Sequence, residues 1–324
     1  MKIKSKENYY VDLYEEPHKL SDHSKTFTDS LKFTGAELMR AIVSAGMPDV
    51  YLTKKEKRNR KEEIYFKVKL FETFVVSSAG GELSFDTSRK DYLDSTEIGA
   101  INYWIGMVLI TVLGQKKYHY DFMVHLSMIS RFSSKLSLKK RPFLVSGKIT
   151  FKSPDLLAIN SKKNTYGVFE SKGYTDYKKD AMERGYTQAK SIRKVNGKSP
   201  EHRLVVMTLT GKKYIQMIEK DPEGEKCDIT VDLLFLYLYH FLPIIELIKE
   251  LNPIECEGRM CGLLEYDDES YSVSVPLNLY EKLSLLTQSD TVPFEKSLKN
   301  NSVEEMFLSN SSSYDSNRRI LLVE

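Results

Sequence analysis

Cysteine is scarce in this chain, which narrows the kinds of site that it can build. Three cysteines occur among 324 residues, Cys227, Cys256 and Cys261, and no two of them form a C-x-x-C pair. A zinc knuckle needs closely paired thiolates, and a disulfide framework needs an even number of cysteines. Neither is predicted, and a cytoplasmic location with reduced thiols is expected.

Sequence motifs of several enzyme classes are absent as well. The chain contains no P-loop, no G-x-G-x-x-G and no G-x-S-x-G, and its six histidines lie in no H-x-x-x-H or H-x-x-E-H spacing. These motifs mark NTPase motors, dinucleotide-binding enzymes, α/β-hydrolases and zinc hydrolases. The chain is therefore not expected to belong to these classes.

A strong net charge and a long uncharged apolar run are missing too. The 48 basic and 45 acidic residues leave a formal charge of +3, so local patches must carry any phosphate binding. The N-terminal ten residues lack the apolar region of a signal peptide. The apolar stretch 101–113 is too short to span a bilayer, and 231–248 contains charged residues and Pro243. Both are predicted to be buried core helices, with a membrane-associated helix as the alternative for the second. No integral membrane span is expected.

The most informative part of the chain is a pair of short apolar runs, 153–160 and 166–173, separated by a polar gap at 161–165. Apolar runs on both sides of such a gap predict a β-hairpin. Glu170 and Lys172 are two residues apart, so a strand points both side chains to the same face.

The register of this hairpin decides which residues meet. If the turn centres between Lys162 and Lys163, Asp155 lies opposite Glu170. If it centres on Lys163, Asp155 lies opposite Ser171. The first register brings Asp155, Glu170 and Lys172 together at one end of a sheet.

Two facing carboxylates and an amine have a specific chemical use. The carboxylates repel each other unless a cation lies between them, and oxygen ligands suit Mg²⁺ or Mn²⁺. A metal-bound water is acidified and can attack phosphorus. Lys172 would position or deprotonate that water, or stabilise charge in the transition state. The competing interpretation is an exposed hairpin with one surface ion pair; the surrounding pattern favours a site.

These residues resemble the PD-(D/E)XK nuclease superfamily, whose fold is the restriction-endonuclease-like fold. Pro154 and Asp155 match its PD element, and 170–172 matches its E-x-K element. The resemblance covers roughly positions 91–215. It implies that Asp155, Glu170 and the backbone carbonyl of Ser171 hold the metal, that Lys172 acts on the attacking water, and that Gln188 looks like the family's helical glutamine.

A helix is predicted over 178–195, after the hairpin. Small residues at 181 and 185 allow close packing on the sheet and place Gln188 inward on the same stripe. Gln188 either is a buried amide or orients a water or phosphate. The other side of the helix is basic and is either a solvated face or a contact for a phosphodiester backbone; its residues are Lys178, Lys179, Arg184, Lys190, Arg193 and Lys194.

Glu97 has two interpretations of equal weight. It can complete a capping box with Asp94 at the start of the following apolar segment. It can also supply the further acidic metal ligand that the family resemblance implies for the helix before the sheet.

These patterns predict three regions along the chain and one fold class. Residues 1–90 are expected to form an N-terminal region of unclear role, which has a charge run at 54–63 and strand-like alternation over 64–76. Strands are also predicted at 143–145 and 148–151, leading into the hairpin. Residues 91–251 are expected to form a nuclease-like α/β core with a central mixed sheet flanked by helices in the order α-β-β-β-α-β. Residues 252–324 are expected to form an appendage with a Ser- and Asn-rich tail.

The expected function is Mg²⁺-dependent hydrolysis of nucleic acid, with DNA favoured over RNA. A homodimer or partner subunit is allowed, and a restriction or phage-defence setting follows from family analogy alone. The alternative is a non-catalytic nucleic-acid- or protein-binding subunit that keeps the fold.

Overall fold

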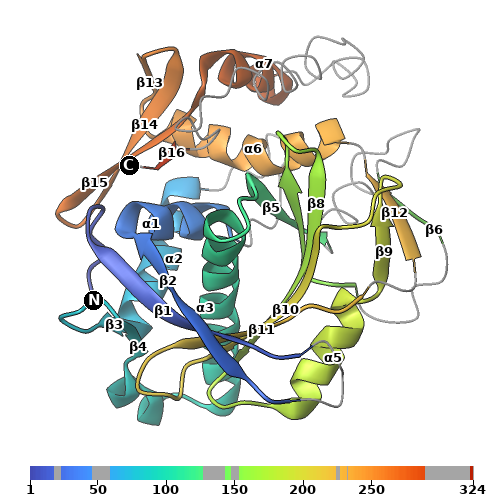
Figure 1. The fold of residues 1–324 in the computed structure, drawn as a ribbon. Helices are drawn as coiled ribbons and strands as arrows, with labels where there is room; N and C mark the ends of the chain where they lie inside the picture. The colour runs from blue at the N-terminus through green and yellow to red at the C-terminus, as the bar shows by residue number, and fades with distance from the viewer. Residues whose placement is uncertain are drawn as a thin grey trace.

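The computed structural model describes residues 1–17, 23–45, 59–126, 143–146, 153–223, 227–231, 233–288 and 322–323. In these residues a mixed sheet of seven strands runs through the molecule (Figure 1). The strands, in spatial order, are β2 (Thr26–Thr34), β1 (Asn8–Glu15), β11 (Gln216–Lys220), β10 (His202–Leu209), β8 (Thr165–Tyr174), β7 (Leu156–Asn160) and β5 (Phe122–His125). Helices flank this sheet, so the predicted α/β class with a central mixed sheet is confirmed.

The strand directions vary across the sheet. β5, β7 and β8 are antiparallel neighbours, β8 runs parallel to β10, and β10 is antiparallel to β11. β1 then pairs with β11 in parallel, with Asp12 opposite Gln216. The predicted N-terminal region 1–90 therefore contributes two strands to the same sheet as the predicted core.

Two helices cover opposite faces of the middle of the sheet. α3 (Ser95–Lys116) packs on one face of β8, and α5 (Lys179–Ala189) packs on the other. Glycines make the approach possible: a Cβ on Gly173 would lie 2.0 Å from the Asn102 carbonyl oxygen of α3, and one on Gly185 would lie 2.5 Å from Val205 Cγ2. Both helices are thus held tightly against the strand that carries the predicted site.

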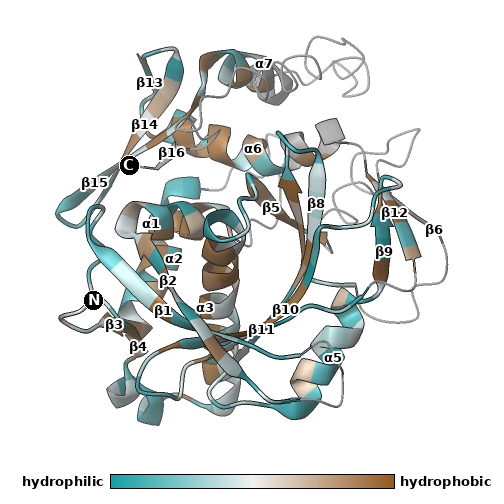
Figure 2. Ribbon diagram, viewed as in Figure 1, coloured by the Kyte–Doolittle hydropathy of each residue, from teal (hydrophilic) through white to brown (hydrophobic). Residues whose placement is uncertain are grey.

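α3 is apolar along most of its length, whereas α5 carries many polar residues (Figure 2). Among the described helices, α3 alone is long and apolar enough to cross a membrane, but 67% of that apolar window is buried in the fold. This is weak evidence for a membrane span, because a helix that is hydrophobic all round also suits the core of a large protein.

The remaining described elements form a helical layer and three small sheets. The helices are α1 (Gly35–Ser44), α2 (Arg60–Phe74), α6 (Leu233–Glu250) and α7 (Leu277–Gln288), with a 3₁₀ helix at Thr87–Tyr92. The small sheets are β3 (Val75–Ser77) with β4 (Leu83–Phe85), β6 (Phe143–Ser146) with β12 (Cys227–Val231) and β9 (Ile192–Val195), and β13 (Ile254–Cys256) with β14 (Arg259–Tyr266), β15 (Glu269–Pro276) and β16 (Leu322–Val323).

One predicted strand near the N-terminus was wrong, and another lies in a different sheet from the one expected. Residues 64–76 alternate like a strand, yet α2 occupies most of them: Ile64, Val68 and Phe71 are buried at helical spacing, and Phe66 is 67% exposed. The strand predicted at 143–145 is present as β6, and the one predicted at 148–151 lies outside the described residues. β6 pairs with β12 in another sheet, however, and the neighbour of β7 is β5.

The helix predicted over 178–195 ends early. α5 stops at Ala189, and Ile192 begins β9, which pairs in parallel with β12. Ile192 and Val195 are buried while the two residues between them are exposed, so strand pairing and burial override the helical spacing. Arg193 and Lys194 are consequently not on the helix that carries Gln188.

Candidate active site

The β7–β8 hairpin adopts the register that joins the two carboxylates. Leu156 is opposite Phe169, which places Asp155 opposite Glu170 and the turn centre between Lys162 and Lys163. This confirms the first of the two predicted registers.

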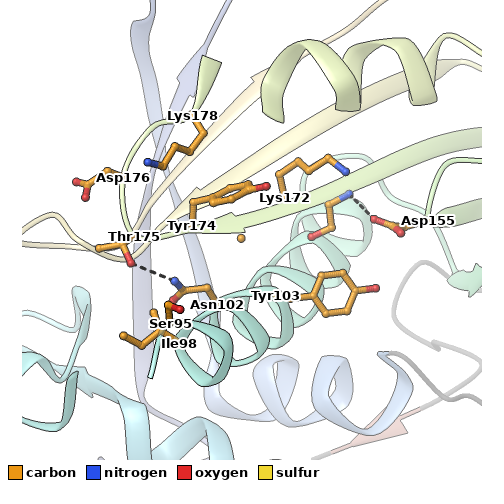
Figure 3. A pocket seen from close by; sticks show the side chains of 13 residues that line it. Ser95, Ile98, Asn102, Tyr103, Asp155, Lys172, Tyr174, Thr175, Asp176 and Lys178 are labelled. Atoms are coloured by element: carbon orange, nitrogen blue, oxygen red, sulfur yellow. Dashed lines mark hydrogen bonds between the residues drawn. The ribbon is translucent and has the colours of Figure 1, made fainter. Parts of the chain in front are cut away.

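Asp155 and Glu170 are linked directly through the backbone. The Asp155 backbone N–H donates to Glu170 Oε2 at 2.9 Å, and Asp155 Oδ2 accepts from the Ser171 N–H at 3.0 Å (Figure 3). Each carboxylate is therefore fixed by a main-chain donor from the neighbouring strand. This arrangement holds both acids at the point where β7 begins.

Glu170 is buried in an environment that disfavours its charge. Its side chain is 1% exposed. Burial, and then the nearby Asp155 carboxylate, raise the pKa of Glu170 to about 8, although Lys172 acts in the opposite direction. Without a cation, the site therefore favours a proton on Glu170 near neutral pH.

Lys172 bridges the carboxylate and the helix α5. Its Nζ bonds Glu170 Oε1 and donates to Gln188 Oε1 at 3.0 Å. Gln188 Nε2 in turn donates to the Ser153 carbonyl at 3.4 Å, which ties the helix to the entry of β7. A Cβ on Gly185 would lie 3.2 Å from Lys172 Cε, so a larger residue there would require the lysine side chain to shift by a few tenths of an ångström.

A pocket of about 570 Å³ opens beside Asp155 and Lys172 (Figure 3). It lies between the first turns of α3 and the end of β8 with its following loop. Its lining residues are Ser95, Ile98, Gly99, Asn102, Tyr103, Asp155, Ser171, Lys172, Gly173, Tyr174, Thr175, Asp176 and Lys178. Of the four predicted catalytic residues, Asp155 and Lys172 therefore line this concave surface, whereas Glu170 and Gln188 do not.

Tyr103 and its neighbour His125 were not predicted as site residues. Tyr103 projects from α3 and its hydroxyl lies 3.3 Å from His125 Nε2. Burial, with the negative charges of Asp155 and Glu170, raises the pKa of the Tyr103 hydroxyl. Tyr103 lies in an apolar helical run, where an aromatic residue indicates core packing, so its sequence position gives no functional signal.

Glu97 caps α3. Its Oε2 accepts from the Asp94 N–H at 2.9 Å, while Asp94 Oδ1 accepts from the Glu97 N–H at 2.9 Å. The capping box is complete, and Glu97 is absent from the pocket lining. Of the two interpretations, the cap describes what its side chain does.

The predicted basic residues occupy different surroundings. Lys178 lines the pocket, and Arg184 is exposed on α5. Lys179 lies 4.0 Å from Glu183, Lys190 is a C-cap whose Nζ lies over the Tyr186 ring, and Arg193 forms two bonds to Asp228. Lys194 is exposed on β9. The structure therefore divides them between α5 with its two caps and β9. Of the charge run at 54–63, residues 54–58 lie outside the described residues.

Within the described part of the chain, no group of three or more His, Cys, Asp or Glu side chains lies in a metal-binding arrangement. A cation at this site would have two carboxylates as its acidic ligands. Comparison of the chain with protein-family models, curated proteins and solved structures finds no match.

Proposed function

We propose that the chain is a divalent-metal-dependent nuclease that hydrolyses phosphodiester bonds, with DNA as its substrate. The observation that carries this proposal is the convergence of Asp155, Glu170 and Lys172 at the start of the β7–β8 pairing, beside an open pocket. This is the arrangement that hydrolysis at phosphorus requires: acidic ligands, an amine and room for substrate.

The element order supports a restriction-endonuclease-like core. α3, β5, β7, β8, α5 and β10 follow one another as α-β-β-β-α-β within the central sheet and its two covering helices, although β6 and β9 intervene along the chain and belong to another sheet. The hairpin and the helix after it provide the PD, E-x-K and Gln positions that the sequence resemblance implies.

The donor set fits a hard cation. Asp155 and Glu170 offer carboxylate oxygens, and Mg²⁺ is commonly bound through one or two carboxylates together with waters and substrate oxygens. Burial, and then the Asp155 carboxylate, raise the pKa of Glu170, and a cation bound between the two acids would act in the opposite direction. When bound, a divalent cation would acidify a water molecule and offset charge that develops on the phosphate.

Lys172 and Gln188 would act on the reacting groups. The Lys172 ammonium is held between Glu170 Oε1 and Gln188 Oε1, and these two bonds fix its position in the site. There it can hold the attacking water or donate hydrogen bonds to the phosphate oxygens. Gln188 orients Lys172 through its Oε1 atom, while its Nε2 atom donates to the Ser153 carbonyl oxygen.

The test is cleavage of circular DNA, supplied in duplex and single-stranded forms, with Mg²⁺ or EDTA. We expect cleavage only with the metal. Lys172→Ala should lower turnover by about 100-fold or more while keeping metal affinity. Asp155→Asn and Glu170→Gln should remove activity through loss of metal affinity.

Control variants decide between the nuclease and a non-catalytic binding subunit. Tyr92→Ala changes an exposed residue outside the pocket and should leave turnover unchanged. Cleavage that persists in EDTA, or that survives in all three site variants, would refute the nuclease. Binding of DNA with no cleavage under any metal would favour the non-catalytic subunit.

A further inference from the structure

The pocket follows an edge of β8 that its neighbour leaves open. β7 pairs with β8 only as far as Leu156 opposite Phe169, whereas β10 accompanies β8 to Tyr174. Among the described residues, 170–174 therefore have a partner strand on one side only. Beyond the last β7–β8 pair, the Ser171 N–H donates to Asp155 Oδ2 instead of to a strand. The main chain after it faces the pocket.

The pocket floor is a fixed polar group. Asn102 is 2% exposed, its Nδ2 donates to Thr175 Oγ1 at 3.3 Å, and its Oδ1 accepts from Thr210 Oγ1 at 2.8 Å. These bonds join α3 to the two loops that follow β8 and β10. The floor is therefore held from three elements, and it does not depend on a bound ligand for its shape.

Aromatic side chains form part of the walls. Tyr103 from α3 and Tyr174 from β8 both line the pocket, and Tyr103 remains 42% exposed (Figure 3). An exposed aromatic ring beside a phosphate-handling site is a platform on which an unpaired base can stack.

The charges along the pocket suit a phosphate chain rather than a neutral ligand. Lys172 lies at the end of the pocket that holds Asp155, and Lys178 and Asp176 lie at the other end, after β8 (Figure 3). The two lysines therefore offer positive charge at both ends of the pocket. The acidic residues at the pocket are Asp155 and Asp176, of which Asp155 belongs to the proposed metal site.

The size of the pocket limits what can enter it. About 570 Å³ lies within the range of about 300–1,000 Å³ that holds small ligands. Nucleotides of one strand fit this range. A base can stack on Tyr103 only when it is unpaired and out of its own stack, so the strand that enters is not part of an intact duplex.

We infer that this pocket binds an unpaired nucleic-acid strand, with a base stacked on Tyr103 and phosphates between Lys172 and Lys178. The inference rests on the proposed function and adds its substrate class: single-stranded or locally unpaired DNA.

Binding is measured in EDTA, so that cleavage does not interfere, by anisotropy of fluorescein-labelled oligothymidylate alone and annealed to oligodeoxyadenylate. The wild-type protein should bind the strand more tightly than the duplex. Tyr103→Ala should weaken strand binding by about 5- to 100-fold, the range expected from loss of one stacked base, and leave duplex binding unchanged. Tyr103→Phe, which keeps the ring, should bind like wild type.

Tyr92→Ala is the matched control, because Tyr92 is 88% exposed and lies outside the pocket lining. It should bind both probes as the wild type does. Equal or tighter binding of the duplex by the wild type would overturn the inference, and so would equal losses for both probes in Tyr103→Ala. Strand-selective binding without any metal-dependent cleavage would refute the nuclease but keep the pocket. Cleavage of duplex DNA by a protein that does not prefer the single strand would keep the nuclease and refute the inference about the pocket.

Discussion

The Asp155 N–H donates to a carboxylate oxygen of Glu170, so a main-chain hydrogen bond holds the two acids together against the repulsion between their charges. The bond keeps them adjacent even when neither is neutralised. A cation would therefore enter a site whose geometry is already set, and it would lose little free energy to rearrangement of the protein.

Metal binding should release a proton from Glu170. Its pKa is about 8 in the folded chain and about 4.5 when unfolded. Its contribution to stability is therefore present below about pH 4.5 and is lost as pH rises toward 8. Mg²⁺ affinity should rise over the same window. Calorimetry in buffers of different ionisation enthalpy should show proton release near neutral pH that disappears in Glu170→Gln; no release in the wild type would contradict the ligand assignment.

Gly185→Ala should damage both stability and turnover. The new Cβ would lie 2.5 Å from Val205 Cγ2 and 3.2 Å from Lys172 Cε, so α5 or the lysine must move. Overpacking of this kind costs about 1–3 kcal/mol. Gly99→Ala is the control for stability, because nothing lies within 4 Å of its added Cβ, and it should gain about 0.5–1 kcal/mol in helix α3. Urea unfolding measures the stability of both variants. If Gly185→Ala were as stable as Gly99→Ala, the contact at Gly185 would be relaxed in solution.

Glu97→Ala should lower stability without changing metal affinity. Loss of a helix cap costs about 0.5–2 kcal/mol, and Asp94→Ala should fall in the same range because the two residues form one capping box. Thermal unfolding and a Mg²⁺ titration separate the two roles. A large loss of metal affinity in Glu97→Ala, but not in Asp94→Ala, would identify Glu97 as a ligand instead.

His240 should make the fold sensitive to acid. It is buried against Phe122, and burial followed by the charge of Arg40 lowers its pKa to about 3. Because the unfolded value is higher, the unfolded state takes up protons first, and stability falls as pH drops below about 6.5. The loss between about pH 7 and 5 should be about 2 kcal/mol. Denaturant curves should show a smaller loss for His240→Phe; an unchanged pH dependence would assign the effect to other groups.

Lys178 and Arg193 should differ in their contribution to DNA binding. Lys178 lines the pocket, whereas Arg193 is already paired with Asp228 through two bonds. Lys178→Ala should weaken binding of every sequence and reduce the salt slope by about 1, as expected for one phosphate contact. Arg193→Ala should leave the slope unchanged. The opposite result would move the binding surface to β9.

The hairpin was predictable because its information is local. A five-residue polar gap between apolar runs predicts the hairpin, and the alternation of a strand puts Glu170 and Lys172 on one face. The sequence left two registers open, and the pairing of Leu156 with Phe169 shows which of them places Asp155 opposite Glu170. The inward position of Gln188 followed from helical spacing in the same way. These features needed no knowledge of distant parts of the chain.

The missed features depend on distant contacts. Ile192 ends up in a strand because β12 is beside it, and Phe66 sits on a helix because Ile64, Val68 and Phe71 find a core at helical spacing. Tyr103 belongs to the site only because α3 lies against the end of β8. Local propensity carries no signal for such neighbours.

The parallel pairing of β1 with β11 joins residues about 200 positions apart, as Asp12 opposite Gln216 shows. During synthesis, β1 and β2 leave the ribosome long before their partner, and such a hairpin is marginal in water without further strands or a covering helix. A chain that stops before residue 216 would lack the strand that connects β1 and β2 to the half of the sheet bearing Glu170. Truncated products should consequently be prone to aggregate, and a complete sheet can form only after residues 216–220 have been made.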